Sequence, residues 1–99
     1  MKYKITAVAL DKRGRVISVG TNSKTTHPLQ AAYHKRAGYR TQYGFLHAEL
    51  SCLLKSRGHR VRSLVISRFL ADGSPALARP CCSCQLAIKE FGVKKVIHT

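Results

Sequence analysis

The chain has 99 residues, with 18 lysines and arginines against four acidic residues, so its formal net charge is +14. A chain of this length predicts a single domain, residues 1–99, which buries only about 60–65% of its unfolded surface. No apolar stretch is long enough for an export signal or a membrane span, which excludes a membrane partner and predicts an intracellular, reducing, cytoplasmic location.

The excess of positive charge favours a polyanionic partner. Self-repulsion among so many cations is unfavourable unless a polyanion offsets it, and a long nucleic acid does so better than a single monophosphate. We therefore expect a phosphate-bearing substrate or partner, with single-stranded DNA or RNA as the best fit. The alternative is a basic surface that serves solubility alone.

The first predicted elements form a β-hairpin. Residues 3–10 are rich in strand-forming side chains, residues 11–14 form a turn in which Gly14 suits a positive φ, and residues 15–20 return as a second strand. Asn22 follows this strand, and an asparagine there caps a turn or contacts a ligand.

Residues 24–45 combine aromatic rings with cations. A short helix over residues 30–37 ends at Gly38, and Tyr43 is one of several tyrosines among the lysines and arginines. Rings that stack on bases and cations that meet phosphates are features of a single-strand binding surface. The alternative interpretation is an exposed basic loop whose tyrosines pack inward.

The rest of the chain predicts alternating helices and strands. These elements are a helix over 46–57, a strand over 64–66 that extends to residue 70, a turn over 71–75, a helix over 81–91 and a strand over 93–98. A strand–helix–strand unit makes its two strands parallel, so we expect a four-stranded sheet with helices. Phe69 is a candidate for stacking on a base, although an aromatic residue at a strand end more often belongs to the core.

Segment 79–84, Arg-Pro-Cys-Cys-Ser-Cys, has the spacing of a metal site. If a helix begins near Cys81, then Cys81 and Cys84 lie on one face of its first turn, where the positive helix end stabilises thiolates. With His47 they supply the three ligands that a catalytic zinc ion takes from a protein, leaving a fourth position for water. A Cys-x-x-Cys pair with an upstream histidine favours metal over a disulfide, and Cys82 takes an exposed or outer position.

Glu49 is the candidate proton carrier. It stands two residues after His47, so the two side chains converge only over a helix N-terminus. That arrangement places a carboxylate beside a zinc-bound water, from which it takes a proton and passes it on.

The pattern His-Ala-Glu at residues 47–49 with Pro-Cys-Cys-Ser-Cys at 80–84 resembles the cytidine deaminase superfamily. The resemblance extends over most of the chain and implies an α/β fold, a three-layer α-β-α sandwich truncated after its fourth strand, with one Zn²⁺ per chain. It also implies that Asn22 contacts the substrate sugar and that the backbone around Ala48 holds the base edge. Lys24 replaces a carboxylate that nucleoside deaminases usually carry, which places a phosphate-seeking charge near the sugar.

The implied reaction is the hydrolytic deamination of cytosine to uracil, with Glu49 moving protons to the ring nitrogen and the departing amine. Charge and residues 24–45 favour single-stranded nucleic acid as substrate, and therefore an editing role. Free (deoxy)cytidine or (deoxy)cytidylate is the alternative, and purine deaminases share the same motif.

A non-catalytic zinc module is the competing interpretation from another class. Three cysteines, at positions 81, 82 and 84, would then close a four-ligand structural site with His47, and the charge would bind nucleic acid. Glu49 argues against this, because a structural site needs no acid at that position. A sheet that ends after its fourth strand also leaves an edge for pairing, which favours a homo-oligomer.

Overall fold

A mixed β-sheet and three helices make up the described part of the molecule, which the computed structural model provides for residues 3–23, 25–38 and 45–99. The elements follow in this order: β1 (Tyr3–Leu10), β2 (Val16–Thr21), α1 (Pro28–Arg36), α2 (Ala48–Lys55), β3 (Ser63–Leu70), β4 (Pro75–Ala76), α3 (Cys82–Glu90) and β5 (Lys95–His98). None of the described helices has the length and apolar content that a membrane crossing requires.

β1 lies at the centre of the sheet, between β2 and β3, and pairs antiparallel with both. β5 pairs with β3 in parallel through the crossover helix α3, so the predicted hairpin and the parallel crossover are confirmed. The described strands number five rather than the expected four, because Pro75 and Ala76 pair with the end of β3 as β4. A two-residue strand leaves no periodic pattern in a sequence, and residue 75 was expected in a turn.

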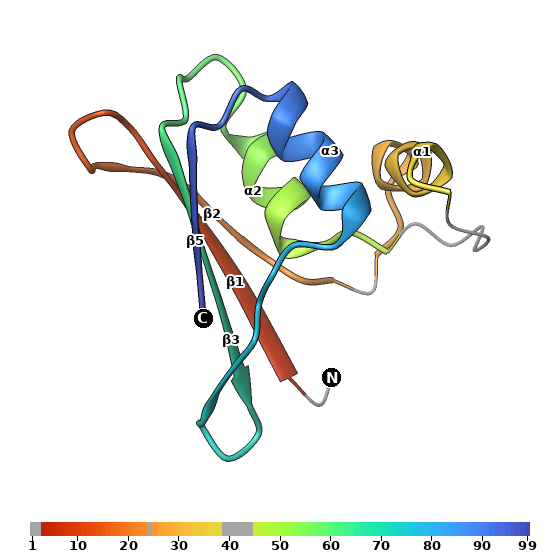
Figure 1. The fold of residues 1–99 in the computed structure, drawn as a ribbon, viewed down its shortest axis with the longest axis vertical. Coiled ribbons are helices and arrows are strands. Elements are labelled where there is room, and N and C mark those ends of the chain that lie inside the picture. The colour runs from red at the N-terminus through yellow and green to blue at the C-terminus, as the bar shows by residue number, and fades with distance from the viewer. Residues whose placement is uncertain (1–2, 24, 39–44) are drawn as a thin grey trace.

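The helices cover one face of this sheet. α2 packs on β1 and β2, α3 packs on α2, and α1 packs on the far side of α3 (Figure 1). The α/β class is confirmed, but the second outer helical layer of an α-β-α sandwich is not formed by the described residues. Strand β3 accordingly has one buried face, with Leu64 and Ile66 buried and Val65 only half-buried.

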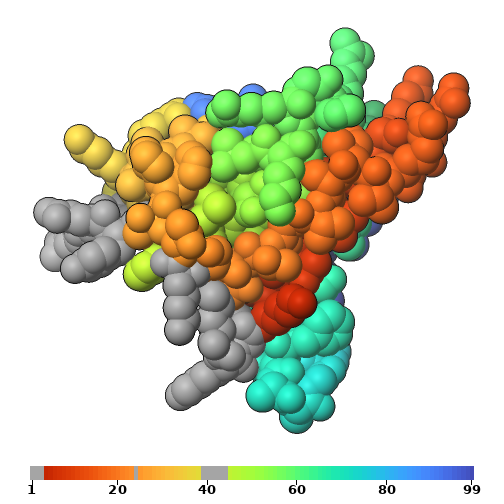
Figure 2. Space-filling model, turned by 180° about the vertical axis from the view of Figure 1, so that it is seen from behind, coloured from red at the N-terminus to blue at the C-terminus, as the bar shows by residue number. Residues whose placement is uncertain are grey.

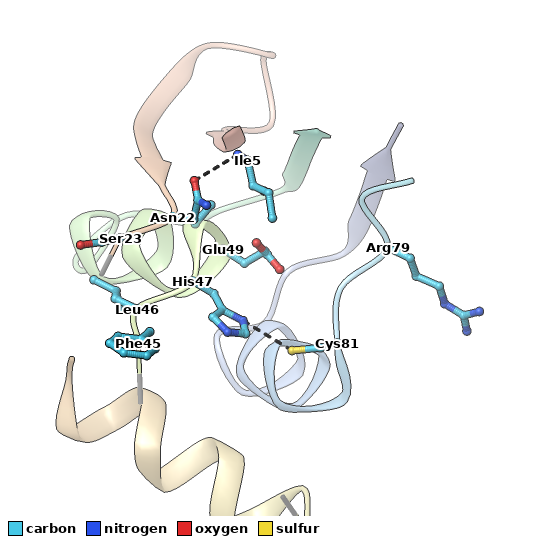
Figure 3. A pocket seen from close by; sticks show the side chains of 10 residues that line it. Ile5, Asn22, Ser23, Phe45, Leu46, His47, Glu49, Arg79 and Cys81 are labelled. Carbon is cyan, nitrogen blue, oxygen red and sulfur yellow. Dashed lines mark hydrogen bonds between the residues drawn. The ribbon is translucent and has the colours of Figure 1, made fainter. Parts of the chain in front are cut away.

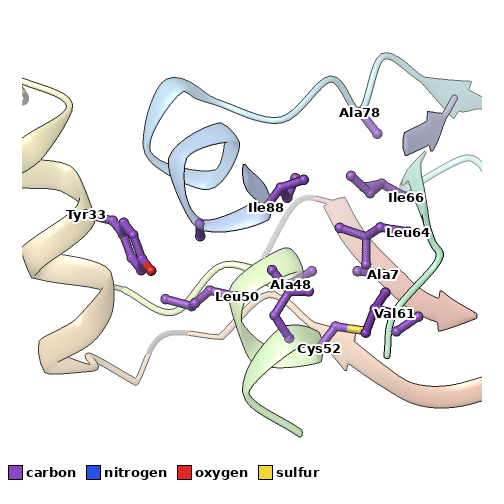
Figure 4. Close-up of a cluster of buried hydrophobic side chains, with 13 residues drawn as sticks. Ala7, Tyr33, Ala48, Leu50, Cys52, Val61, Leu64, Ile66, Ala78 and Ile88 are labelled. Atoms are coloured by element: carbon purple, nitrogen blue, oxygen red, sulfur yellow. The ribbon is translucent and has the colours of Figure 1, made fainter. Parts of the chain in front are cut away.

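The core lies between the sheet and the helices (Figure 4). Leu50 and Leu53 of α2 belong to one buried cluster with Ala7, Leu64 and Ile66 of the sheet. Within it, Leu50 points toward Tyr33 of α1 (Figure 4). The close approach of α2 to β2 requires Gly20, because a Cβ there would lie 2.5 Å from the Ala48 carbonyl oxygen. This contact fixes the first turn of α2, which carries the candidate site.

All three helices begin slightly away from the predicted residues. α1 starts at Pro28, two residues early, because proline suits the first helical position and the His27 Nδ1 accepts the Leu29 N–H (3.1 Å). α2 starts two residues late and α3 one residue late, so His47 and Cys81 precede their helices with extended backbones. β2 and β5 lie at edges of the sheet, where another chain can pair. The homo-oligomer stays a prediction.

Candidate metal centre

The N-termini of α2 and α3 meet, and their capping residues face each other. The carbonyls of His47 and Cys81 accept the first helical hydrogen bonds, from Ser51 (3.0 Å) and Gln85 (2.9 Å). Neither side chain caps its own helix. The His47 Nδ1 instead lies 3.5 Å from the Cys81 Sγ, so the two helix starts are joined through their side chains (Figure 3).

Cys84 completes a three-ligand cluster. Its Sγ lies 3.2 Å from the His47 Nδ1, and the possible ligand atoms of His47, Cys81 and Cys84 all lie within 4.8 Å of one another. Cys84 is in the first turn of α3 and is fully buried. The convergence over two helix ends that the sequence predicts is therefore present.

The two sulfurs and the imidazole form a donor set for a cation. A hydrogen bond with Cys84 lowers the pKa of Cys81, and the same contact with burial raises the pKa of Cys84. One imidazole and two thiolates, with no carboxylate ligand among them, bind zinc in preference to hard cations such as Mg²⁺ or Ca²⁺.

Glu49 lies beside this cluster as the second residue of α2, with only 5% of its surface exposed. Burial raises the pKa of its carboxyl group above the ordinary value. A carboxyl group that holds a proton more readily is suited to accept and release one during a reaction.

A cavity of about 380 Å³ opens onto the cluster. It is lined by the backbone and side chains of Ile5, Asn22, Ser23, Phe45, Leu46, His47, Ala48, Glu49, Arg79 and Cys81. In Figure 3 the side chains of His47, Glu49 and Cys81 gather at one side of it, while Arg79 points away from the other labelled residues. The volume is within the usual range for sites that hold one small molecule.

Two predicted substrate residues line this cavity. Ala48 is buried at the start of α2, and Asn22 lies at the end of β2. The Asn22 Oδ1 accepts the Ile5 N–H (3.1 Å), so the side chain also ties β2 to β1. Lys24 and Tyr43 lie outside the described residues.

Phe69 does not reach the cavity. β1 residue Ile5 lines the cavity and pairs with Arg68 across the sheet, so the next residue, Phe69, points to the opposite face. Its ring is exposed there, and the prediction that it stacks on a substrate base is wrong. Cys82 is also exposed and lies outside the ligand cluster, whereas Cys52 is a core residue.

Gln30 is a residue of the site that sequence reasoning missed. Its Oε1 accepts the His47 N–H (3.1 Å) and its Nε2 donates to the Ser83 Oγ (3.2 Å), so one buried amide joins both ligand-bearing helix starts. The buried His34, also on α1, packs its ring edge-on against His47 with centroids 5.1 Å apart. Burial lowers the pKa of His34.

Replacing Gln30 by alanine is expected to weaken zinc binding by about 10–100-fold, because outer hydrogen bonds orient metal ligands. Competition with a chromophoric chelator measures the affinity. Lys35→Ala is the control, because Lys35 is an exposed residue of the same helix α1 and lies outside the ligand cluster. Equal zinc affinities for the two variants would show that Gln30 does not position the site.

The family model for the "cytidine and deoxycytidylate deaminase zinc-binding region" matches residues 1–99 of the chain. The chain belongs to this deaminase family. Two solved deaminases share its fold: a mutant cytidine deaminase from Mycobacterium tuberculosis and a dCMP deaminase from the cyanophage S-TIM5, each 24% identical with a TM-score of 0.57. Each match covers 99% of this chain, and the chain spans 67% and 65% of those proteins. The comparison with curated protein sequences gave no match.

Membership of the deaminase family and the cluster identify the cofactor as a single Zn²⁺. The match over the whole chain agrees with the resemblance that the motifs at residues 47–49 and 80–84 indicate.

Proposed function

We propose that this deaminase-family protein catalyses the zinc-dependent hydrolytic deamination of cytosine to uracil. His47, Cys81 and Cys84 hold the metal, and Glu49 is the catalytic acid and base. The observation that carries the proposal is the placement of a buried carboxyl group beside a three-ligand cluster, at the wall of a cavity. When bound, zinc supplies Lewis-acid activation of water at neutral pH.

Each residue around the ligand cluster has a separate role in the proposed reaction. Glu49 accepts a proton from water and delivers it to the ring nitrogen of cytosine, while the water oxygen bonds to the carbon that carries the amino group. Glu49 then takes the second proton from that oxygen and gives it to the amine, which leaves as ammonia when its carbon–nitrogen bond breaks. In this proposal the backbone of Ala48 binds the base edge and Asn22 contacts the sugar, which their positions in the cavity lining support. Leu46 and Phe45 supply apolar wall, which excludes water from the reacting ring.

The proposed substrate is a cytosine in single-stranded nucleic acid. The net charge of +14 and the exposed Arg79 at the cavity support a polyanion. A cavity of this volume accepts one nucleotide, so a strand must present an unstacked base. The two structural neighbours, a cytidine deaminase and a dCMP deaminase, favour a second candidate, a free cytosine nucleoside or nucleotide.

A structural zinc module fits the geometry less well. That reading needs a fourth protein ligand, and Cys82, the nearest cysteine in sequence, is exposed and outside the cluster. Three ligands with an adjacent cavity are the pattern of a catalytic zinc site.

The test is a product assay with deoxycytidine, deoxycytidylate, deoxyadenosine and a single-stranded oligonucleotide containing one cytosine. Uracil formation from the oligonucleotide, slowed by added salt, is the expected result. Reaction of the mononucleotide alone, at a rate that salt hardly changes, would reject the polymer and support the second candidate. Product from deoxyadenosine only would overturn the choice of base.

A further inference from the structure

Three loops meet at the end of the molecule that lies away from the metal centre. They are the β1–β2 turn, the α2–β3 loop and the α3–β5 loop (Figure 1). The Arg62 N–H donates to the Leu10 carbonyl (2.8 Å), and the Arg62 carbonyl accepts the N–H groups of Lys94 and Lys95 (both 3.1 Å). These backbone hydrogen bonds hold the loops in a fixed arrangement.

Cations line the hollows between the loops. A cavity of about 570 Å³ has Lys12, Arg60, Arg62 and Lys94 in its wall, together with His59 and the ring of Phe91. A second cavity, of about 360 Å³, shares three of these residues and continues along the hairpin past Arg13 and Arg15. Apart from Arg15, which pairs with Asp11, the cationic side chains and the histidine of the two walls are called the basic end here: Lys12, Arg13, His59, Arg60, Arg62 and Lys94.

The cations of the basic end outnumber the acidic groups near them, since Asp11 is the one acidic residue that the described part of the chain contributes to the walls of the two cavities. The chain has four acidic residues. Asp11 lies in the wall of the smaller cavity, where it pairs with Arg15. The other three are engaged elsewhere: Glu90 with Arg36, Asp72 with Ser74, and Glu49 beside the ligand cluster. In the described ranges no carboxylate forms an ion pair with a cation of the basic end. Holding several like charges on one rigid frame is unfavourable until an anion binds among them.

We propose that the basic end binds the phosphate backbone of a single-stranded nucleic acid, at a surface separate from the metal centre. Several cations spaced along connected hollows fit a repeated phosphate rather than a single one. The half-buried ring of Phe91 provides an apolar surface against which a base stacks. A single strand can enter the hollows between the loops and contact their walls, whereas a flat lipid surface cannot reach these walls.

The basic end and the catalytic cavity lie at opposite ends of helices α2 and α3. The metal centre lies at the N-termini of α2 and α3, and the basic end follows their C-termini. An eight-residue helix such as α2 is about 12 Å long, so one nucleotide does not occupy both places. In Figure 2 the loop after α2 (green) lies next to the hairpin (orange-red) at one corner of the molecule. The proposal goes beyond the deamination reaction and does not rest on it.

The test measures binding of a fluorescein-labelled oligothymidylate, which contains no cytosine, to the zinc-loaded protein by fluorescence anisotropy across a salt series. Arg60→Gln/Lys94→Gln removes one cation from each side of the larger cavity. Lys4→Gln/Lys35→Gln is the control, since it removes the same charge from exposed residues of β1 and α1. Thermal unfolding and zinc content confirm that both variants are folded.

The first variant is expected to lower the slope of log affinity against log salt by about 1.4, at about 0.7 for each lost phosphate contact, while the control keeps the wild-type slope. Equal losses in the two variants, or no loss in either, would overturn the proposal. Tighter binding to phosphatidylserine vesicles than to the oligonucleotide would also overturn it. Turnover of free deoxycytidine in the first variant reports on the catalytic site separately, because neither residue lines that cavity.

Discussion

Glu49→Gln is expected to reduce deamination by a factor of about 10²–10⁴ while the protein keeps its zinc, because the amide cannot exchange the proton that the reaction moves. Glutamine has nearly the shape of the buried glutamate, so the first turn of α2 and the ligand cluster should be unchanged. Steady-state uracil formation and metal analysis on the same sample measure the two quantities.

Glu90→Gln is the matched control for this change. Glu90 is an exposed residue at the end of α3 that accepts a hydrogen bond from Tyr33 (2.6 Å) and pairs with Arg36. Its replacement should leave turnover within about twofold, since an exposed ion pair contributes little to stability. Turnover of Glu49→Gln at the level of Glu90→Gln would show that Glu49 carries no proton in the reaction.

Removing zinc is expected to lower the midpoint of thermal unfolding by roughly 15–30 °C. Zinc present at about 1,000 times its dissociation constant stabilises the folded state by about 4 kcal/mol, and a domain of this size shifts by about 4–8 °C for each kcal/mol. The ligands come from helices that start 34 residues apart, so the metal joins α2 to α3 across the core. Calorimetry with and without a chelator measures the difference.

Two cysteine variants distinguish the loss of a zinc ligand from a general loss of stability. Cys84→Ala should lose zinc and unfold at the temperature of the metal-free protein or below, because the buried sulfur is a ligand. Cys82→Ala should keep its zinc and its unfolding midpoint, because Cys82 is exposed and outside the cluster. Loss of zinc from the Cys82 variant, or its retention in the Cys84 variant, would contradict the ligand assignment.

The metal centre was predictable because its signals are local. Cys81 and Cys84 share the first turn of one helix, and the spacing of His47 and Glu49 requires a helix N-terminus, so only the meeting of the two helix starts had to come from the fold. Gln30 has no such signal: its partners His47 and Ser83 lie 17 and 53 residues away. A glutamine in a polar helix has no spacing that marks it as buried.

The errors at Phe69 and at β4 have the same origin. The face to which Phe69 points depends on its register with β1, and β4 exists only because its backbone pairs with Arg68 and Phe69. Neither is encoded in a local pattern. The basic end shows the same limit, since the sequence predicts a polyanion from total charge but not which of its cations the three loops bring together.

X-ray absorption at the zinc edge of the purified protein distinguishes a catalytic from a structural zinc site. We expect one zinc per chain with two sulfur ligands at about 2.3 Å and one imidazole nitrogen at about 2.0 Å, together with a light-atom ligand from solvent. A shell of three or more sulfurs, or a folded protein without stoichiometric zinc, would contradict this expectation.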